Sequence, residues 1–200
     1  METSILIFIA MLLSYVIGSL CSAVIVCHLC HLPDPRSEGS RNPGTTNVLR
    51  IAGKKYAIIV LLADLLKGLL PVLVIQWTDL PLVYSGCVGL AAVLGHIFPI
   101  FFKFKGGKGV ATTLGVLFGL NWLLGLLAVL TWLAVAAITR YSSLAAIIAL
   151  VVSPLYLWLI EPIRGPVIIP MSVIVVCVLY QHRENIQRLW RGEESKIKLK

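Results

Sequence analysis

The chain alternates between long runs of apolar residues and short polar segments. A helix that crosses the hydrocarbon core of a bilayer needs about 20 apolar residues, or somewhat fewer where the helix is short. Five runs meet this condition and predict membrane-spanning helices, over 4–27, 56–76, 82–99, 142–160 and 166–180. The pattern therefore predicts an all-α polytopic membrane protein.

A further apolar stretch, 110–139, contains thirty residues and no charge. A single helix there would be about 45 Å long at 1.5 Å per residue, whereas the hydrocarbon core is about 30 Å thick. Asn121 and Trp122 stand near its middle, where they predict an interfacial turn between two short helices. The pattern alone leaves six or seven spans open.

The composition excludes an ordinary soluble domain. Hydrophobic residues make up 58% of the 200 residues, charged residues 13%, and the mean hydropathy is +0.94, whereas about a quarter of a soluble domain is charged. The 17 Lys and Arg against nine Asp and Glu give a net charge of +8. In a soluble protein this surplus would indicate nucleic-acid binding. In a membrane protein it indicates basic loops on one face, and we expect no nucleic-acid partner.

The distribution of the basic residues decides between six and seven spans. With seven spans and a periplasmic N-terminus, fifteen of the 17 Lys and Arg fall on one face, in the loops 28–55, 100–109 and 139–141 and in the C-terminal tail. Six spans would place loop 28–55 and the tail on opposite faces, against the positive-inside rule. We therefore expect one domain, residues 1–200, with seven transmembrane helices, some of them short, and a cytoplasmic C-terminus.

The first polar cluster on this face runs from residue 39 to residue 50, with the sequence GSRNPGTTNVLR. Its Gly and Asn residues allow turns whose backbone N–H groups converge on an anion. Thr45 is expected to cap a short helix that ends at Gly53, which places Thr46 and Arg50 four residues apart on one helix face. An ordinary polar loop is the alternative.

The second cluster, residues 95–112, has the sequence GHIFPIFFKFKGGKGVAT. Gly106, Gly107 and Lys108 directly precede an apolar helix, so loose backbone amides and one ammonium are expected to face an anion there. The segment is not a Walker A loop, because Phe102 stands where that pattern requires Gly. Its aromatic residues are typical of an interfacial belt with snorkelling lysines such as Lys105.

The third cluster is divided between the start of the helix predicted over 142–160 and the segment after the last span. Ser142 and Ser143 stand where a serine either caps a helix or contacts a ligand. His182, Asn185 and Arg188 share one helix face by their spacing. The alternative for the tail is a solvated basic segment touching anionic lipid.

Together the clusters supply Arg, Lys, Ser, Thr, Asn and His donors, which suit one or two phosphates beside an acyl chain. The acidic residues on that face are scattered, which disfavours magnesium-dependent phosphotransfer, and we expect no metal and no cofactor. A membrane transporter of organic phosphate is the competing function. The sequence shows no inverted repeat and no matched pair of interrupted spans, and Asp64 and Lys67 predict an intramembrane pair.

The segments GSRNPGTTNVLR, GHIFPIFFKFKGGKGVAT and HRENIQRLWRGEE resemble the three signature regions of the bacterial membrane acyl-phosphate:glycerol-3-phosphate acyltransferases, the PlsY family. The resemblance extends from Gly18 to about Glu194. One departure is that the family usually reads GSGN where this chain has Arg41 as the third residue. The resemblance implies transfer of a fatty acyl group from acyl-phosphate to the 1-hydroxyl of sn-glycerol 3-phosphate, giving lysophosphatidic acid and phosphate.

The resemblance also implies roles for residues of this chain. Ser40, Arg50 and Lys108 would hold the glycerol phosphate. The acyl-phosphate would be held by Gly44, Thr45, Thr46, Ser143, His182 and Asn185, with Asn185 facing the developing oxyanion. Further substrate-binding candidates are Asn47, Gly106, Gly107 and Ser142. For the proton acceptor, His96, His182 and the phosphate of glycerol 3-phosphate all stay open. We expect a functional monomer in the bacterial cytoplasmic (inner) membrane, with its site at the cytoplasmic face.

Overall fold

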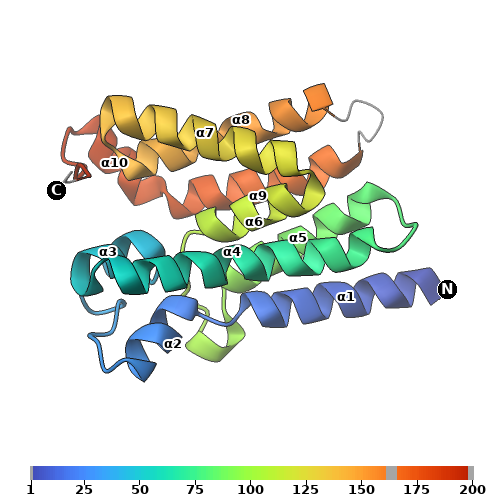
Figure 1. Ribbon diagram of the computed structural model, residues 1–200, viewed down its shortest axis with the longest axis horizontal. Coiled ribbons are helices and arrows are strands. Elements are labelled where there is room, and N and C mark those ends of the chain that lie inside the picture. The colour runs from blue at the N-terminus through green and yellow to red at the C-terminus, as the bar shows by residue number, and fades with distance from the viewer. Residues whose placement is uncertain (1, 161–165, 198–200) are drawn as a thin grey trace.

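The computed structural model describes residues 2–160 and 166–197. Within them the chain is helical almost throughout, and Figure 1 shows its long helices lying side by side. The α-helices are α1 (Glu2–Gly18), α2 (Ser22–Leu29), α3 (Thr45–Ala52), α4 (Lys54–Gln76), α5 (Leu82–Ile97), α6 (Val110–Leu120), α7 (Trp122–Thr139), α8 (Ser142–Ile160), α9 (Ile168–Gln181) and α10 (Arg183–Trp190). A short 3-10 helix, η1 (Ile100–Phe102), follows α5.

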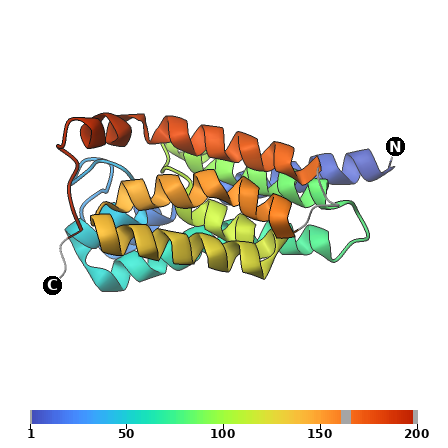
Figure 2. The ribbon, with the colours of Figure 1, turned by 90° about the horizontal axis from the view of Figure 1, so that it is seen from above.

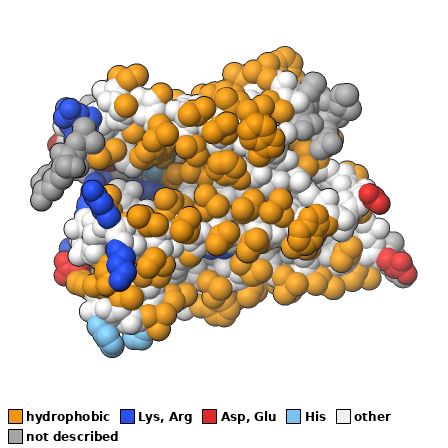
Figure 3. Space-filling model, viewed as in Figure 1, with side chains coloured by type: hydrophobic (Ala, Val, Ile, Leu, Met, Phe, Trp, Pro, Cys, Tyr) orange, Lys and Arg blue, Asp and Glu red, His pale blue; other side chains and the backbone are white. Residues whose placement is uncertain are grey.

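The long helices carry apolar side chains on their outer faces. Four segments among the described residues are long and apolar enough to cross a bilayer: α4, Leu82–Phe102, α7 and α8. The bent pair α1 and α2 makes a fifth if it is counted as one span, and α6 and α9 are shorter apolar helices. Large side chains such as Phe8, Ile138 and Trp158 are more than half exposed. Such a surface is unfavourable in water but suits lipid, and Figure 3 shows it along the whole length of the molecule.

The run predicted as one helix over 4–27 is broken, and that part of the prediction was wrong. The axes of α1 and α2 differ by 42° across a break of three residues. At the end of α1, the amide and the hydroxyl of Ser19 both donate to the carbonyl oxygen of Tyr15, at 2.9 and 2.8 Å. The ammonium of Lys67, in α4, donates to the carbonyl oxygen of Leu20 at 2.9 Å. A buried polar group from another helix therefore satisfies a carbonyl that the break frees.

The break predicted at the middle of 110–139 is confirmed. Asn121 has an extended backbone, with φ −163°, and its side-chain oxygen accepts a hydrogen bond from the amide of Leu123 at 2.9 Å. This is N-capping of α7. The preceding helix, α6, has 11 residues and is therefore about 16 Å long.

Close helix–helix packing uses small residues. A Cβ on Gly18 would overlap the backbone of Ala92, so α1 and α5 touch backbone to backbone, and Gly115 of α6 meets Leu65 of α4 in the same way. Lipid supplies no hydrophobic driving force between helices, so the van der Waals contacts of such close packing stabilise their association. The largest buried cluster brings together residues of α4 to α9, among them Leu117, Leu124, Leu150, Met171 and Ile174.

The described Lys and Arg residues gather at one end of the helices, which we call the basic end. It comprises the segments 28–55, 98–109, 139–141 and 182–197, and every described Lys and Arg except Lys67 lies in them. Figures 1 and 2 show α3, α10 and the C-terminus at this end and the N-terminus at the other. Figure 3 shows blue side chains at the basic end and red ones at the opposite end of that face.

Candidate active site

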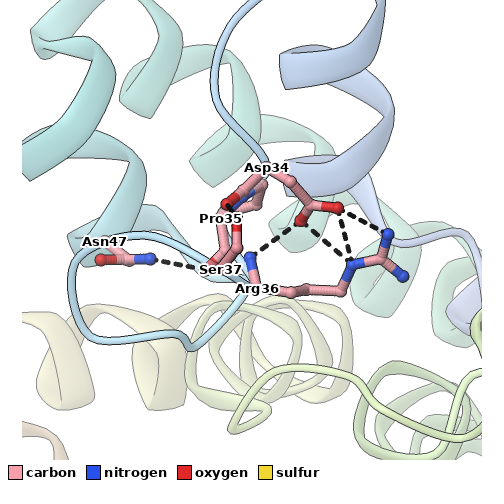
Figure 4. Close-up of polar contacts among 5 residues, drawn as sticks. All are labelled: Asp34, Pro35, Arg36, Ser37 and Asn47. Carbon is pink, nitrogen blue, oxygen red and sulfur yellow. Dashed lines mark hydrogen bonds and ion pairs between the residues drawn. The ribbon is translucent and has the colours of Figure 1, made fainter.

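The first cluster is a loop fixed by Asn47, which is buried in the first turns of α3. Its side-chain oxygen accepts from the amide of Ser40 at 2.8 Å, and its NH2 group donates to the carbonyl oxygens of Pro35 and Glu38 at 2.8 and 2.9 Å. Figure 4 shows Asn47 directed toward Pro35, beside the forked pair of Arg36 and Asp34. Both N–H donors of Asn47 are thus used within the protein, and its direct effect is to shape the loop that carries Ser40.

Helix α3 begins at Thr45, one residue earlier than a helix capped by Thr45 would. Gly44 occupies the N-cap position, so the prediction that Thr45 caps the helix was wrong, whereas the predicted end at Gly53 is confirmed. The first turn of a helix leaves its backbone amides without intrahelical acceptors. The hydroxyl of Thr45 is buried and has no hydrogen-bond partner among the described residues, and Thr46 is exposed beside it. Thr45 and Thr46 therefore place several donors at one spot, whereas the amide of Gly44 already donates to the carbonyl oxygen of Asn42 at 2.9 Å.

The glycines before Lys108 pack onto α5. The amides of Gly106 and Gly107 donate to the carbonyl oxygens of Ile97 and His96, each at 3.2 Å. The expectation of loose amides at these two positions was therefore wrong, because they satisfy the C-terminal carbonyls of α5. A Cβ on Gly107 would overlap Nε2 of His96, so only glycine fits there. Lys108 follows directly, half-buried, whereas Lys105 is exposed.

Segments far apart in the sequence meet around one carboxylate. The ammonium of Lys108 donates to the side-chain oxygen of Asn185. The NH2 group of Asn185 and the hydroxyl of Ser143 both donate to Oε1 of Glu194, each at 2.6 Å, and Arg188 donates to Oε2 at 2.7 Å. We call these five residues the anion cluster. It joins the segment before α6 to α8, α10 and the C-terminal tail.

The charges of the anion cluster perturb one another. Burial lowers the pKa of Lys108 to about 8, and the positive charge of Arg188 acts in the same direction. Burial alone would raise the pKa of Glu194, but the hydrogen bonds from Ser143, Asn185 and Arg188 outweigh it and leave that pKa below its usual value. Such hydrogen bonds stabilise a carboxylate in its charged form. The cluster therefore holds a deprotonated carboxylate beside an ammonium that titrates near neutral pH.

His182 stands between α9 and α10 and is neutral at pH 7. Burial lowers its pKa to about 4. Its Nδ1 lies 2.8 Å from the carbonyl oxygen of Val178. A carbonyl only accepts, so Nδ1 carries the proton and Nε2 keeps its lone pair. His182 thus offers an acceptor atom for a hydroxyl.

The remaining candidates surround this cluster in different ways. Arg50 is exposed and donates to the hydroxyl of Ser195 at 2.7 Å, and Ser40 is exposed in the first loop. Ser142 is half-buried at the first position of α8. His96 is buried in α5, where Nδ1 of its imidazole lies 3.5 Å from Asp64, on the interior side of Gly107.

Sequence reasoning missed Glu194 and the tail that carries it. Glu194 lies 51 residues from Ser143 along the chain, and its charge counted only as one of several scattered acids. The tail continues across the basic end, where the amide of Ile197 donates to the carbonyl oxygen of Arg140 at 2.7 Å. The only available signal was its place at the end of the third signature segment.

Comparison with known proteins identifies the family. The profile of the glycerol-3-phosphate acyltransferases matches residues 8–192. The chain belongs to this family. A glycerol-3-phosphate acyltransferase of Francisella tularensis subsp. holarctica is 52% identical over 190 residues, covering 95% of this chain and 92% of the relative. One of Haemophilus ducreyi is 50% identical over 190 residues, covering 95% of this chain and 94% of the relative.

Solved structures agree with the family assignment. A crystal structure of PlsY (YgiH), an integral membrane glycerol 3-phosphate acyltransferase, in its glycerol 3-phosphate form, has a TM-score of 0.91 with this chain. The two are 38% identical, and the match covers 96% of each chain. The lysophosphatidic acid form of the same protein gives a TM-score of 0.87 at 37% identity, covering 96% of this chain and 95% of the other.

The family membership settles the choice between enzyme and transporter. The chain is an all-helical, multi-pass integral membrane enzyme, a glycerol-3-phosphate acyltransferase that acts in phospholipid synthesis. Acylation of one hydroxyl of glycerol 3-phosphate gives lysophosphatidic acid. The resemblance of the three signature segments to the PlsY family is confirmed.

Proposed function

We propose that the acyl donor is acyl-phosphate and that the acceptor is the 1-hydroxyl of sn-glycerol 3-phosphate. The hydroxyl oxygen attacks the acyl carbon, the bond from that carbon to the phosphate oxygen breaks, and the products are 1-acyl-glycerol 3-phosphate and inorganic phosphate. A mixed anhydride already has a good leaving group, so catalysis can rest on positioning and charge stabilisation. The observation that carries the proposal is the convergence of Ser143, Asn185 and Arg188 on one carboxylate, with Lys108 bound to the same Asn185.

Glycerol 3-phosphate is proposed to bind through Ser40, Arg50 and Lys108. Lys108 reaches the centre of the anion cluster, and Arg50 reaches the tail beside it through Ser195. A phosphate bound there would take the place of a neutral hydroxyl as the partner of Arg50, which is a stronger hydrogen bond. The solved structure of the relative in its glycerol 3-phosphate form supports this substrate.

Acyl-phosphate is proposed to bind at the start of α3 and on the inner side of the anion cluster. Thr45 and Thr46, which follow the N-cap Gly44, present first-turn amides and the Thr45 hydroxyl, which has no partner among the described residues. The second N–H of Asn185 faces the developing oxyanion, and the hydroxyl of Ser143 turns from Glu194 to the reacting group when acyl-phosphate binds. Gly106, Gly107 and Ser142 complete the surroundings, while Asn47 acts through the loop that it shapes.

The proton of the attacking hydroxyl is proposed to pass to the phosphate of glycerol 3-phosphate. His182 has a pKa of about 4, which makes it a weak base at neutral pH, whereas a phosphate monoester has its second pKa near 6. The free Nε2 of His182 would accept a hydrogen bond and so orient a substrate hydroxyl. His182 then acts by holding substrate.

The membrane arrangement is proposed to be seven spans of a single domain, functional as a monomer, in the bacterial cytoplasmic membrane. The spans are the pair α1 and α2 together with α4, α5, α6, α7, α8 and α9. Because the basic end carries almost all of the positive charge, it is assigned to the cytoplasm and the N-terminus to the periplasm. Reporters fused after Gly53, Lys105, Tyr141 and Arg188 would all be cytoplasmic, and a reporter at 78–80 would be periplasmic. A periplasmic signal after Tyr141 would contradict seven spans.

The donor is tested with purified protein in detergent and long-chain acyl-phosphate. Phosphate release should require glycerol 3-phosphate and should match lysophosphatidic acid formation one to one. Parallel reactions with the same acyl group on coenzyme A or on acyl carrier protein should give no product. Product from either thioester at a comparable rate, or phosphate release without glycerol 3-phosphate, would overturn the proposed donor.

A further inference from the structure

Three ionisable side chains lie buried among the apolar helices, away from the anion cluster. They are Asp64 and Lys67 of α4 and His96 of α5, which are 2%, 6% and 6% exposed. The ammonium of Lys67 lies 2.8 Å from Oδ1 of Asp64, and Nδ1 of His96 lies 3.5 Å from the same oxygen. Charged groups inside a membrane protein are costly to bury and are functional candidates by default. We call these three residues the interior cluster.

One side of the interior cluster reaches the break between α1 and α2. Lys67 forms an ion pair with Asp64 and donates a hydrogen bond to the carbonyl oxygen of Leu20, at 2.9 Å. Ammonium groups have three donors and no acceptor. Lys67 therefore ties the chain that enters the basic end to α4.

The other side of the interior cluster lies beneath the segment that ends at Lys108. Nε2 of His96 is so close to Gly107 that a Cβ there would overlap it. The amides of Gly106 and Gly107 are also held by the last carbonyls of α5, including that of His96. Asp64 faces Nδ1 of His96, which favours a proton on Nδ1 and leaves Nε2 toward the glycine. The imidazole thus limits how closely the backbone at Gly107, one residue before Lys108, can approach α5.

We propose that Asp64, Lys67 and His96 are positioning residues that hold segment 106–108 so that Lys108 meets Asn185. The inference rests on the proposed role of Lys108 in binding the phosphate of glycerol 3-phosphate. In this proposal the ring of His96 lies between Asp64 and Gly107 and positions the segment that carries Lys108. His96 is therefore no longer a candidate for the proton acceptor. The interior cluster acts on the reaction through Lys108.

The first test is His96→Ala, with His96→Gln as the conservative variant. The KM for glycerol 3-phosphate should rise about tenfold in His96→Ala while kcat changes less, because a displaced Lys108 weakens substrate binding. The alkaline limb of kcat/KM should also move to higher pH, since Lys108 regains water. The charged neighbours of Lys108 are Arg50, Glu184, Arg188 and Glu194, and His96→Ala alters none of them. His96→Gln, which fills most of the space, should recover part of the loss.

The second test removes the ion pair without leaving a lone buried charge. Asp64→Leu combined with Lys67→Met replaces two charged groups by apolar ones of similar size, an exchange that often leaves stability unchanged. A purely structural pair predicts parental KM in such a variant with parental melting temperature. Our proposal predicts that the KM increase and the shifted alkaline limb persist. The control is Ser14→Ala, which removes a buried hydrogen bond from α1 to Val88 of α5 and should lower the melting temperature without moving KM.

The outcomes separate this inference from the proposed function. Parental KM and an unmoved alkaline limb in folded His96→Ala would overturn the inference, and this variant keeps the ion pair, so it decides even if the double variant fails to fold. If Lys108→Ala itself left KM for glycerol 3-phosphate unchanged, the proposed role of Lys108 would fail. If Lys108→Ala raised KM and neither interior variant did, only the positioning role would be wrong.

Discussion

The anion cluster and the interior cluster both gather charged side chains, partly buried in the first and fully buried in the second, and they differ in how their charges balance. In the interior cluster one carboxylate, Asp64, faces one ammonium, Lys67, at 2.8 Å, and the pair is neutral. In the anion cluster one carboxylate, Glu194, faces Lys108 and Arg188, with Arg50 close by through Ser195.

The difference shows which of the two is prepared for a ligand. A buried pair whose charges already cancel gains nothing from an added anion, whereas a surplus of cations and donors around one carboxylate is stabilised when a phosphate joins them. Charge balance therefore distinguishes the binding site from the support, and so does burial, since Lys108 and Arg188 are partly exposed whereas the interior cluster is buried. The variants below test that distinction.

Asn185→Ala is expected to have the largest effect. Asn185 links Lys108 to Glu194 with two of its polar groups, and its second N–H is proposed to stabilise the oxyanion. Its loss should lower kcat by about two to three orders of magnitude, with little change in the KM for glycerol 3-phosphate. Steady-state kinetics in detergent would measure both. Gln187→Ala, an exposed amide on the same helix, is the control, and a near-normal kcat in Asn185→Ala would remove that residue from the site.

Lys108→Ala and Arg50→Ala should rank next. Each removes a charge-assisted contact to phosphate, and such contacts contribute on the order of 1.5–3 kcal/mol, which corresponds to roughly a tenfold to hundredfold loss of kcat/KM. Lys105→Ala, at an exposed position in the same segment, should be nearly silent. If Lys105→Ala lowered kcat/KM as much as Lys108→Ala, the two lysines would share one role. The surplus positive charge that binds phosphate would then not be confined to the anion cluster.

Glu194→Gln asks whether the carboxylate is part of the binding site or only neutralises it. A glutamine keeps one acceptor oxygen but turns an NH2 group toward Ser143 and Asn185 or toward Arg188, so at least one donor loses its partner. We expect a destabilisation of about 1–3 kcal/mol and about a tenfold lower kcat/KM, since Asn185 is no longer held. Glu193→Gln, its exposed neighbour, serves as the control. Thermal melting and kinetics on the same samples would show whether the two losses occur together.

The pH dependence should separate Lys108 from its neighbours. In the free enzyme its pKa is about 8, so its charge is present below that pH and is lost as the pH rises through it. The kcat/KM for glycerol 3-phosphate should therefore fall about tenfold per pH unit above 8. Lys108→Arg keeps its charge at any of these pH values, and its profile should lack this alkaline limb even if its maximum is lower. An unchanged limb in Lys108→Arg would assign the titration to another group.

The helices could be predicted because the length of each apolar run can be compared with the number of residues that a helix needs to cross the hydrocarbon core. Even the break at Asn121 followed from a stretch too long for one span. The break after Gly18 could not, since the group that satisfies the freed carbonyl of Leu20 is Lys67, 47 residues away.

The site was predictable as residue types in three segments, but not as an arrangement. Lys108 and Asn185 are 77 residues apart, and nothing local indicates that they touch. The glycines before Lys108 were interpreted as anion donors, although their amides serve the end of α5. Glu194 was missed because a carboxylate in a phosphate site has no local signature.

The smallest effect is expected from Arg41→Gly, in the loop that Asn47 shapes. Arg41 has φ +57°, a left-handed conformation that costs a non-glycine residue about 1–2 kcal/mol. Glycine removes that strain but adds about 0.4–1 kcal/mol of disorder to the unfolded chain, so the net stabilisation should be under about 1 kcal/mol, or a melting temperature higher by about 1–3 °C. Arg41→Asn, which also tolerates this conformation, separates backbone strain from loss of charge. Gly39→Ala should act in the opposite direction, because Gly39 also has positive φ and an added Cβ would overlap the side-chain oxygen of Asn47. Equal melting temperatures for Arg41→Gly and the parent would mean that the loop relaxes around Arg41 at no cost, and that Asn47 does not fix it.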